Sequence, residues 1–395
     1  MNAAEHNLRH LRVLLAVVRT GSVTKASQAC NISQPAVTQA LKKLESAFGA
    51  ILFERNGNGV FATPLGALLA DRIERALGFI DGAAASLAPR LILTATTARL
   101  RALVAVAQTE NFSLAARVLG IAQPTIHRAI TQLEGDVGRA LFKRTPYGST
   151  PTRSGHLLAQ AAQMAFSELA QAEMELAEVV GRGDLQITVG GMPLSRSYVL
   201  PQVIAQFQSR YPHVRVRVLE GPYETLLAGL RRTQIDFLFG ALRDPLPVDD
   251  VVQTHLFDDA LVVVAGPDHP LTRARSIDFA GAAHYPWIVA VPGTPARGQF
   301  DAAFKAAVGH APRGLVETSS MILMRELMHQ GPYLGCVSRL QAQSEIEAGL
   351  MTSLPLHISA SERKIGLTTR RDWKPTQTQS AFLAMIQAAF QRAAA

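Results

Sequence analysis

The first 155 residues of this chain contain the same segment twice. Leu11 to Arg55 aligns with Leu100 to Arg144 without a gap, at a constant shift of 89 positions. Because the positions kept in both copies are the ones that such a unit needs, the two copies serve as a small alignment. The identical pairs include Thr20/Thr109, Ala26/Ala115, Ile32/Ile121, Gln34/Gln123, Pro35/Pro124, Leu44/Leu133, Glu45/Glu134, Gly49/Gly138, Phe53/Phe142, Arg55/Arg144, Thr63/Thr152 and Gly66/Gly155.

The length of 395 residues suffices for two or three domains, each with its own core. Apolar residues make up 48% and charged residues 18%, as in soluble globular proteins. The net charge is +8, and up to Arg153 basic residues outnumber acidic ones about two to one. This imbalance favours a polyanionic partner, although a solvated basic surface explains it equally well.

Several classes of protein are disfavoured by what the sequence lacks. No apolar run approaches the ~20 residues that cross a bilayer, and Arg9, Arg12 and Arg19 interrupt the only candidate for a signal peptide. Two cysteines imply no disulfide framework. The histidines are not at metal-ligand spacing, and nucleophile, zinc and phosphate-loop motifs are absent. We therefore expect a cytoplasmic protein that is not an enzyme and uses no metal or cofactor.

Each copy of the repeat is typical of three short helices followed by a hairpin. An apolar helical series opens each copy, and Ser22 or Asn111 is placed to cap a second helix. A third helix then has Pro35 or Pro124 in its first turn, where a missing N–H costs nothing. Polar side chains occupy the outer face of this third helix, as on a recognition helix in the major groove. They are Gln34, Thr38, Gln39 and Lys42 in the first copy and Gln123, His127, Arg128 and Thr131 in the second.

A strand and a tight turn follow each third helix, at residues 53–59 and 142–148. This pattern predicts a wing, with Arg55, Lys143 and Arg144 placed to reach the DNA backbone. An ordinary solvated helix face followed by a loop remains the alternative for either copy.

The string SxTxAAxxLxxSQPxxSxxxxxLExxxGxxLFxR resembles the winged helix-turn-helix of LysR-type transcriptional regulators, and both copies fit it. The first copy keeps Ser33 but has Gln39 where the family often has Arg, whereas the second has Ala122 and His127 and keeps Arg128. The resemblance implies that the third helix, which starts with Ser33 and Pro35 in the first copy and with Pro124 in the second, is the element that contacts double-stranded promoter DNA. The usual family plan has one reader, so binding by both copies does not follow from it.

After each wing the sequence predicts a long helix. The second one has an apolar seam with alternating spacings of three and four, as in a coiled coil. In the family the corresponding linker helix pairs two subunits, whereas packing within the same chain is the alternative. The seam predicted to dimerise consists of Leu158, Ala165, Leu169, Ala172, Leu176 and Val179. The first copy has a poorer seam, whose partner is the second helix, its counterpart on another subunit or its own winged domain.

From residue 183 the rhythm changes to strands alternating with helices. This half resembles the two-lobed, periplasmic-binding-protein-like effector domain of LysR-type regulators. The predicted fold is therefore α/β overall, with two tandem, mainly α winged helix-turn-helix domains at residues 1–90 and 91–182 and the effector domain at 183–395. Lobe one is expected at about 183–265 and 356–395, and lobe two at about 266–355.

Ligands in such folds bind beyond the carboxyl ends of the strands. Ser195 and Thr294 are expected to face each other across a cleft, with Arg243 or Arg297 available for a carboxylate or phosphate. The predicted effector-binding residues are Met192, Ser195, Glu220, Arg243, Gly293, Thr294, Arg297 and Ser319. For each of them, a plain loop or capping role is an equal alternative.

Together these features favour a transcriptional regulator that binds promoter DNA and responds to a small molecule. A homodimer or homotetramer is expected, with RNA polymerase as a further candidate partner and no membrane partner. The stretch Gly366 to Pro375 resembles a subgroup that regulates sugar-binding protein genes. The competing hypothesis is an interaction protein in which one winged unit has lost DNA binding and docks another protein.

Overall fold

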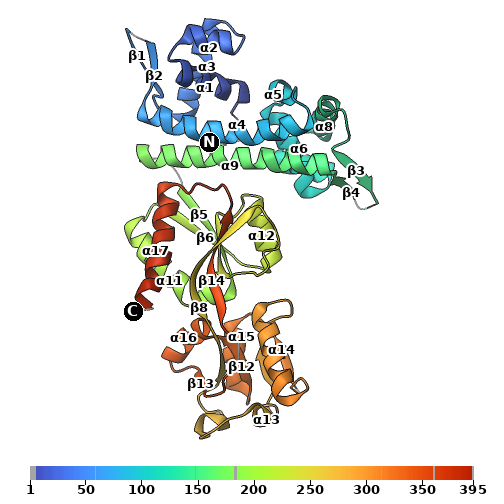
Figure 1. Cartoon of the computed structure of the whole chain (residues 1–395), viewed down its shortest axis with the longest axis vertical. Helices are drawn as coiled ribbons and strands as arrows, with labels where there is room; N and C mark the ends of the chain where they lie inside the picture. The colour runs from blue at the N-terminus through green and yellow to red at the C-terminus, as the bar shows by residue number, and fades with distance from the viewer. Residues whose placement is uncertain are drawn as a thin grey trace. The chain divides into compact units, whose positions relative to one another are not determined.

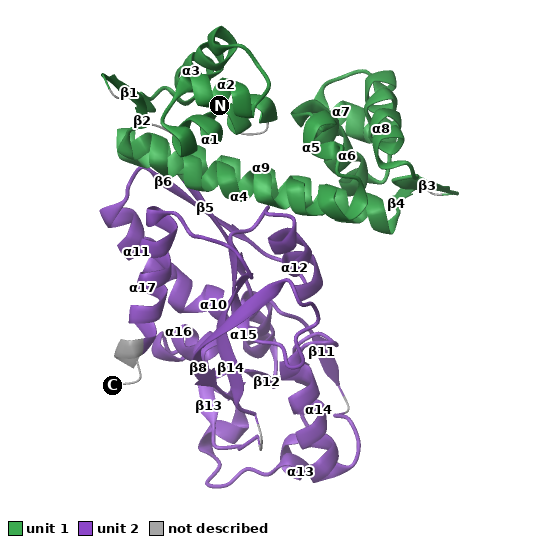
Figure 2. Cartoon of the chain, turned by 45° about the horizontal axis from the view of Figure 1, so that its top comes forward, with its two compact units in different colours: residues 1–185 green, residues 186–395 purple. Residues whose placement is uncertain are grey.

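The computed structural model describes residues 6–57, 59–146, 148–181, 185–312, 314–358 and 361–393. Its contacts divide the chain into two compact units, Met1–Leu185 and Gln186–Ala395 (Figure 2). The fold is a mixed α/β one, with helix-turn-helix segments in the first unit and strands alternating with helices in the second, as the sequence predicts.

Within the first unit the same order of elements occurs twice (Figure 1). The first set is α1 (Leu8–Thr20), α2 (Val23–Ala29), α3 (Gln34–Phe48), β1 (Phe53–Asn56), β2 (Gly59–Ala62) and α4 (Pro64–Leu87). A one-turn helix, α5 (Leu91–Thr94), connects the two sets. The second set is α6 (Thr97–Thr109), α7 (Phe112–Leu119), α8 (Gln123–Val137), β3 (Phe142–Thr145), β4 (Gly148–Pro151) and α9 (Arg153–Val180).

Local sequence explains where these elements begin and why two glycines recur. Ser22 and Asn111 cap α2 and α7, since their side chains accept hydrogen bonds from the backbone N–H groups three residues on, those of Lys25 and Leu114. Gly66 and Gly155 lie in the first turns of α4 and α9. A Cβ atom at either glycine would lie 2.0 Å from the carbonyl oxygen before the wing, so a larger residue does not fit.

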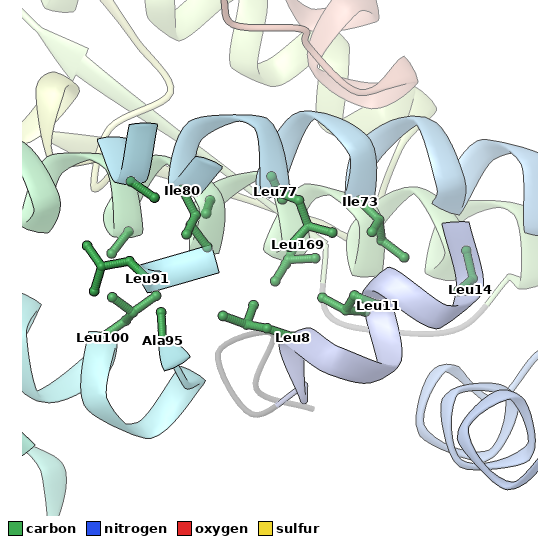
Figure 3. Packing of buried hydrophobic residues seen from close by; sticks show 14 of the residues in the cluster. Leu8, Leu11, Leu14, Ile73, Leu77, Ile80, Leu91, Ala95, Leu100 and Leu169 are labelled. Atoms are coloured by element: carbon green, nitrogen blue, oxygen red, sulfur yellow. The ribbon is translucent and has the colours of Figure 1, made fainter. Parts of the chain in front are cut away.

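The two winged segments share one hydrophobic core. Helices α4 and α9 run antiparallel along each other, with one winged segment near each end of the pair (Figure 1). Leu8 from α1 and Leu100 from α6 belong to the same buried cluster as Ile80 of α4 and Leu169 of α9 (Figure 3). The repeated sequence predicts separate domains at residues 1–90 and 91–182. The structure instead joins them in one unit, because each long helix covers the apolar face of the other.

The second unit consists of two five-stranded sheets. One sheet has the order β6-β5-β7-β14-β8 and the other β11-β10-β12-β9-β13. In the first, β5 and β7 are parallel and β14 is antiparallel to both β7 and β8. The strands are β5 (Leu185–Gly191), β6 (Val214–Leu219), β7 (Phe237–Ala241), β8 (Val251–Asp259), β9 (Leu261–Ala265), β10 (Trp287–Val289), β11 (Leu315–Glu317), β12 (Leu334–Ser338), β13 (Thr352–Leu354) and β14 (Arg363–Arg370).

Helices flank both sheets. In the first lobe α17 packs on α11, and the rings of Phe207 and Phe382 meet there with centroids 4.9 Å apart. The helices are α10 (Pro193–Ser197), α11 (Val199–Arg210), α12 (Tyr223–Arg231), the 3₁₀ helix η2 (Pro270–Arg273), α13 (Phe279–Ala282), α14 (Pro295–Val308), α15 (Met321–Gln330), α16 (Arg339–Glu347) and α17 (Gln377–Ala393).

The chain passes between the lobes at slightly different places from those expected. Strand β9 (Leu261–Ala265) belongs to the sheet of the second lobe, so the first crossing precedes Leu261 instead of lying near residue 266. Leu356 and Ile358 still pack in the core of the second lobe, so the return follows Ile358.

Candidate functional site

The side chains predicted to contact DNA lie on the surface of the first unit. Val37, Leu41 and Leu44 of α3 are buried, as are Ile126 and Ile130 of α8, and this leaves the opposite face of each helix open. Thr38 is half-buried. The other predicted residues are all exposed: Ser33, Gln34, Pro35, Gln39, Lys42, Arg55, Gln123, Pro124, His127, Arg128, Thr131, Lys143 and Arg144.

One of these residues has a structural role as well. The Ser33 hydroxyl accepts a hydrogen bond from the Ala36 N–H (3.4 Å) and so caps α3. Ala122 occupies the same position before α8 and makes no such bond. The serine therefore contributes to the start of the helix whether or not it contacts DNA.

The face of α8 that is predicted to contact DNA is ordered by contacts that no sequence pattern indicates. The His127 ring stacks on Phe112 of α7, with centroids 4.2 Å apart and an interplanar angle of 5°. Gln123 approaches the same imidazole (Nε2 to Nε2, 3.5 Å) and accepts a hydrogen bond from the Ser113 hydroxyl (3.1 Å). In the first copy Val23 and Thr38 occupy the positions of Phe112 and His127, so no such stack forms. The two faces therefore differ in shape as well as in chemistry.

Each wing is held in place relative to its recognition helix by equivalent bonds. The Glu45 carboxylate accepts from the Leu52 N–H (3.0 Å), and the Glu134 carboxylate accepts from the Leu141 N–H (2.8 Å). At the far side of the wing, the Val60 N–H donates to the Gly21 carbonyl (3.0 Å). Arg55, Lys143 and Arg144 lie on β1 and β3, where long cationic side chains can reach phosphates flanking the groove.

The predicted dimerisation seam is occupied within a single chain. Its residues up to Leu176 are buried in the core that α9 shares with α4 and the winged segments, whereas Val179 is 60% exposed. The buried ones are Leu158, Ala165, Leu169, Ala172 and Leu176. Within the chain these residues already have a packing partner, and the prediction that they join two subunits stays a prediction. An apolar seam shows only that a helix needs a packing partner. Here that partner is α4, the counterpart of α9 in the first copy of the repeat.

A buried cluster of charges lies in the same helix pair. Arg72 of α4 donates to Glu168 (2.9 Å), Gln171 (2.8 Å) and Glu175 (2.5 Å) of α9, and Arg75 donates to Glu168 (3.1 Å). The side chains of Arg72 and Glu168 are only 4% and 5% exposed. Burial by itself lowers the pKa of Arg72, but the bonds and charges of Glu175 and Glu168 outweigh it and raise that pKa. The guanidinium therefore stays charged inside the helix pair.

The second unit has a cavity of about 570 Å³ between its two lobes. Residues that follow β5, β6 and β7 line it from the first lobe, as expected for the carboxyl ends of these strands. The second lobe contributes the starts of α14 and α15. Six of the predicted effector residues line the cavity, namely Met192, Glu220, Arg243, Gly293, Thr294 and Ser319.

Two predicted residues, Ser195 and Arg297, do not line the cavity. Ser195 is fully buried, and its hydroxyl donates to the Met192 carbonyl (2.8 Å) because the chain turns directly from β5 into α10. Arg297 is engaged by Asp301 (2.8 Å) and Glu317 (2.5 Å). Thr294 lines the cavity but also caps α14, accepting from the Arg297 N–H (3.3 Å). Ser195 and Thr294 therefore do not form the facing pair that the sequence suggested.

The cavity contains buried donors without partners, most of which the sequence analysis did not single out. Among the described residues, four lining groups have a buried atom that makes no hydrogen bond: Arg196 Nε, Tyr223 OH, Arg243 and Arg363 Nε. Arg196 is paired with Glu220 and Arg363 with Asp259 (2.9 Å). Arg243 lies over the Tyr223 ring, 4.3 Å from its centroid. Desolvation lowers the pKa of Arg243 and raises that of Tyr223, since burial disfavours both charged forms.

Asp259 ties the two lobes together beside this cavity. At the end of β8 its carboxylate accepts from the Ser338 hydroxyl (2.6 Å) at the end of β12 and from Arg363 at the start of β14. Cys336, also on β12, lines the cavity as a neutral group, because burial raises the pKa of its thiol to about 12. The wall near the crossing strands is therefore fixed by charge-assisted bonds.

Over the ranges described above, no helix is long and apolar enough to cross a membrane. In the same part of the chain, no group of three or more His, Cys, Asp or Glu side chains is arranged to hold a metal ion.

Comparison with known proteins identifies both units. Residues 181–391 match the LysR substrate binding domain, and residues 8–67 and 97–156 each match the bacterial regulatory helix-turn-helix of the lysR family. The HTH-type transcriptional regulator GalR of Pseudomonas putida is 33% identical over 389 residues, 96% of each chain. YdcI of Escherichia coli, an uncharacterised HTH-type regulator, is 28% identical over 69% of this chain and 89% of its own length.

Solved structures share the fold. A full-length OxyR variant from Pseudomonas aeruginosa has a TM-score of 0.53 at 22% identity, over 74% of this chain and 94% of that one. Full-length LysG from Corynebacterium glutamicum, solved with a bound arginine effector, has a TM-score of 0.53 at 21% identity, over 74% and 97%. With winged helices in one unit, a two-lobed cavity in the other and family matches to both, this chain belongs to the LysR-type DNA-binding transcriptional regulators.

Proposed function

We propose that the chain is a sequence-specific regulator whose effector is a small organic anion held between the lobes of the second unit. The observation that carries this proposal is Arg243. Its guanidinium is half-buried, lines the cavity and has a buried nitrogen without a hydrogen-bond partner among the described residues. An unmatched, partly desolvated cation is costly, and a carboxylate or phosphate on the ligand offsets that cost.

The rest of the lining supports an anion with an apolar body. Arg196 and Arg363 already have acidic partners, so Arg243 is the cation left for a ligand. The Tyr223 hydroxyl lies beside it as a second donor. Much of the remaining wall is apolar: Met192, Pro193, Leu194, Val291, Pro292, Met321 and Met324. A cavity of about 570 Å³ is within the range typical of small-molecule sites.

A ligand between two lobes has a way to act as a signal. Groups from both lobes line the cavity, so an anion that contacts Arg243 and the start of α15 together favours one lobe arrangement over others. A ligand shifts an equilibrium only by its difference in affinity for the two states. We infer that this difference changes how strongly the chain binds its operator.

Arg243→Gln tests the proposal, with Arg297→Gln as the matched control on an arginine outside the cavity. The probes are aliphatic and aromatic carboxylates, each compared with its neutral primary amide. Both tryptophans lie in the second unit, so intrinsic fluorescence reports its thermal unfolding. We expect at least one carboxylate, but not its amide, to stabilise the parent chain. Loss of a charged hydrogen bond, ~1.5–3 kcal/mol, should weaken binding about 10- to 150-fold in Arg243→Gln only.

Two outcomes contradict the assignment. Equal binding of a carboxylate and its amide would remove Arg243 as an anion site. Equal weakening by Arg297→Gln would move the site away from this cavity. Neither outcome affects DNA binding, which belongs to the first unit.

A further inference from the structure

The helix pair in the first unit places two DNA-reading surfaces in one chain. Because α4 and α9 are antiparallel, the two winged segments lie near opposite ends of the pair (Figure 1). Helix-turn-helix proteins commonly read two half-sites with two identical subunits held at a fixed spacing. Here the second reader is supplied by the same chain.

The charges in the pair favour α4 against α9 over two identical helices. At the shift of 89 positions, the counterpart of Arg72 is Ala161, that of Glu168 is Phe79 and that of Glu175 is Ser86. Ala161 and Phe79 are partly buried against the core. In an equivalent antiparallel pair of two α9 helices, Glu168 would therefore face Ala161 without a cation. Two α4 helices would place Arg72 against Phe79. Buried charge without a partner is strongly destabilising, so α4 is expected to pair with α9 and not with a second α4.

The two reading surfaces differ at equivalent positions. Gln39 on α3 corresponds to Arg128 on α8, and both are exposed. Gln pairs best with adenine and Arg with guanine in the major groove. Thr38 corresponds to His127, which is held by the Phe112 stack. Lys42 corresponds to Thr131, so the cationic side chain lies at a different position on each face: Lys42 on α3 and Arg128 on α8.

We propose that one chain reads a bipartite DNA site with two unlike half-sites, one through α3 and the other through α8. This inference rests on the proposed function, since it requires that the protein binds specific DNA. The operator is then not a palindrome, because its two halves meet different side chains.

The test is selection from duplex DNA with a randomised core several helical turns long, using the full chain. The expected result is two different half-sites at a constant separation close to about 10 base pairs or a multiple of it. Gln39→Ala and Arg128→Ala are then selected in the same way. Each should lower the preference at one half-site about 5- to 150-fold and leave the other unchanged. Ser46→Ala, exposed near the end of α3, is the control and should alter neither.

The remaining outcomes separate the inference from the proposed function. Enrichment of a palindrome, or of one half-site that responds to only one of the two variants, contradicts the inference while DNA binding stands. If only Arg128→Ala has an effect, the first winged segment is not a reader and the hypothesis of a protein-docking module replaces it. Failure to enrich any duplex contradicts the proposed function itself.

Discussion

Leu169→Glu is expected to unfold the amino-terminal unit instead of separating subunits. Leu169 is fully buried between α4 and α9 in a core shared by both winged segments. The substitution removes a packed leucine, at ~2–5 kcal/mol, and buries a carboxylate that has no partner, at several kcal/mol more. For a unit of this size each kcal/mol lowers Tm by ~2–4 °C. We therefore expect a fall of more than ~10 °C, or loss of the transition.

Two probes distinguish the units in this experiment. Far-ultraviolet circular dichroism follows helix content, and the two longest helices, α4 and α9, lie in the first unit. Tryptophan fluorescence follows the second unit, which contains both tryptophans. Val179→Glu lies on the same predicted seam but is 60% exposed, so it should change Tm little. If sedimentation showed folded chains of smaller mass for Leu169→Glu, the seam would be a contact between subunits after all.

Arg72→Met is expected to destabilise the same unit by ~3–5 kcal/mol, because it leaves Glu175 without its cation and Glu168 with Arg75 alone. Chemical denaturation followed by circular dichroism measures the change. Glu74→Gln, also on α4, breaks only an exposed ion pair with Arg19 and should cost less than ~1 kcal/mol.

A second variant separates the charge from the packing. Arg72→Met combined with Glu168→Leu and Glu175→Leu replaces Arg72 and its two carboxylate partners by apolar groups, a change that is often neutral or stabilising for a buried ion pair. Recovery of most of the lost stability is the expected result. If the combined variant were no more stable than Arg72→Met alone, burial of unpaired carboxylates would not be the cause of the defect.

The repeat made much of the first unit predictable, because each copy checks the other. Ser22 and Asn111 occur at the same place before a short helix, and both are caps in the structure. The sequence also predicts the apolar seam of α9, but it does not predict which helix packs against that seam. Leu69 and Leu158 show only that each helix has an apolar side, and the choice between a neighbour in the chain and another subunit depends on three-dimensional packing.

The location of the cavity between the lobes could be predicted from the sequence, but the contacts of its lining side chains could not. Strand order places residues after β5, β6 and β7 at one edge, so Arg243 and Glu220 were found. Arg297 seemed equally available, yet Asp301 and Glu317 neutralise it. Tyr223 and Arg363 reach the cavity from the start of α12 and the start of β14, far apart in sequence, and no local pattern marks them. The stack of Phe112 on His127 could not be predicted from the sequence either, since each residue alone is compatible with an exposed helix.

The shared core of α4 and α9 has a consequence for how the regulator behaves when it is scarce. Two readers that meet by association separate on dilution, because their pairing follows mass action. Here both belong to one polypeptide and are folded around a common core, so their pairing does not depend on protein concentration. With both winged segments reading DNA, as proposed above, binding of one holds the other at a local concentration set by geometry alone. A cell that holds only a few copies of this chain still holds complete pairs.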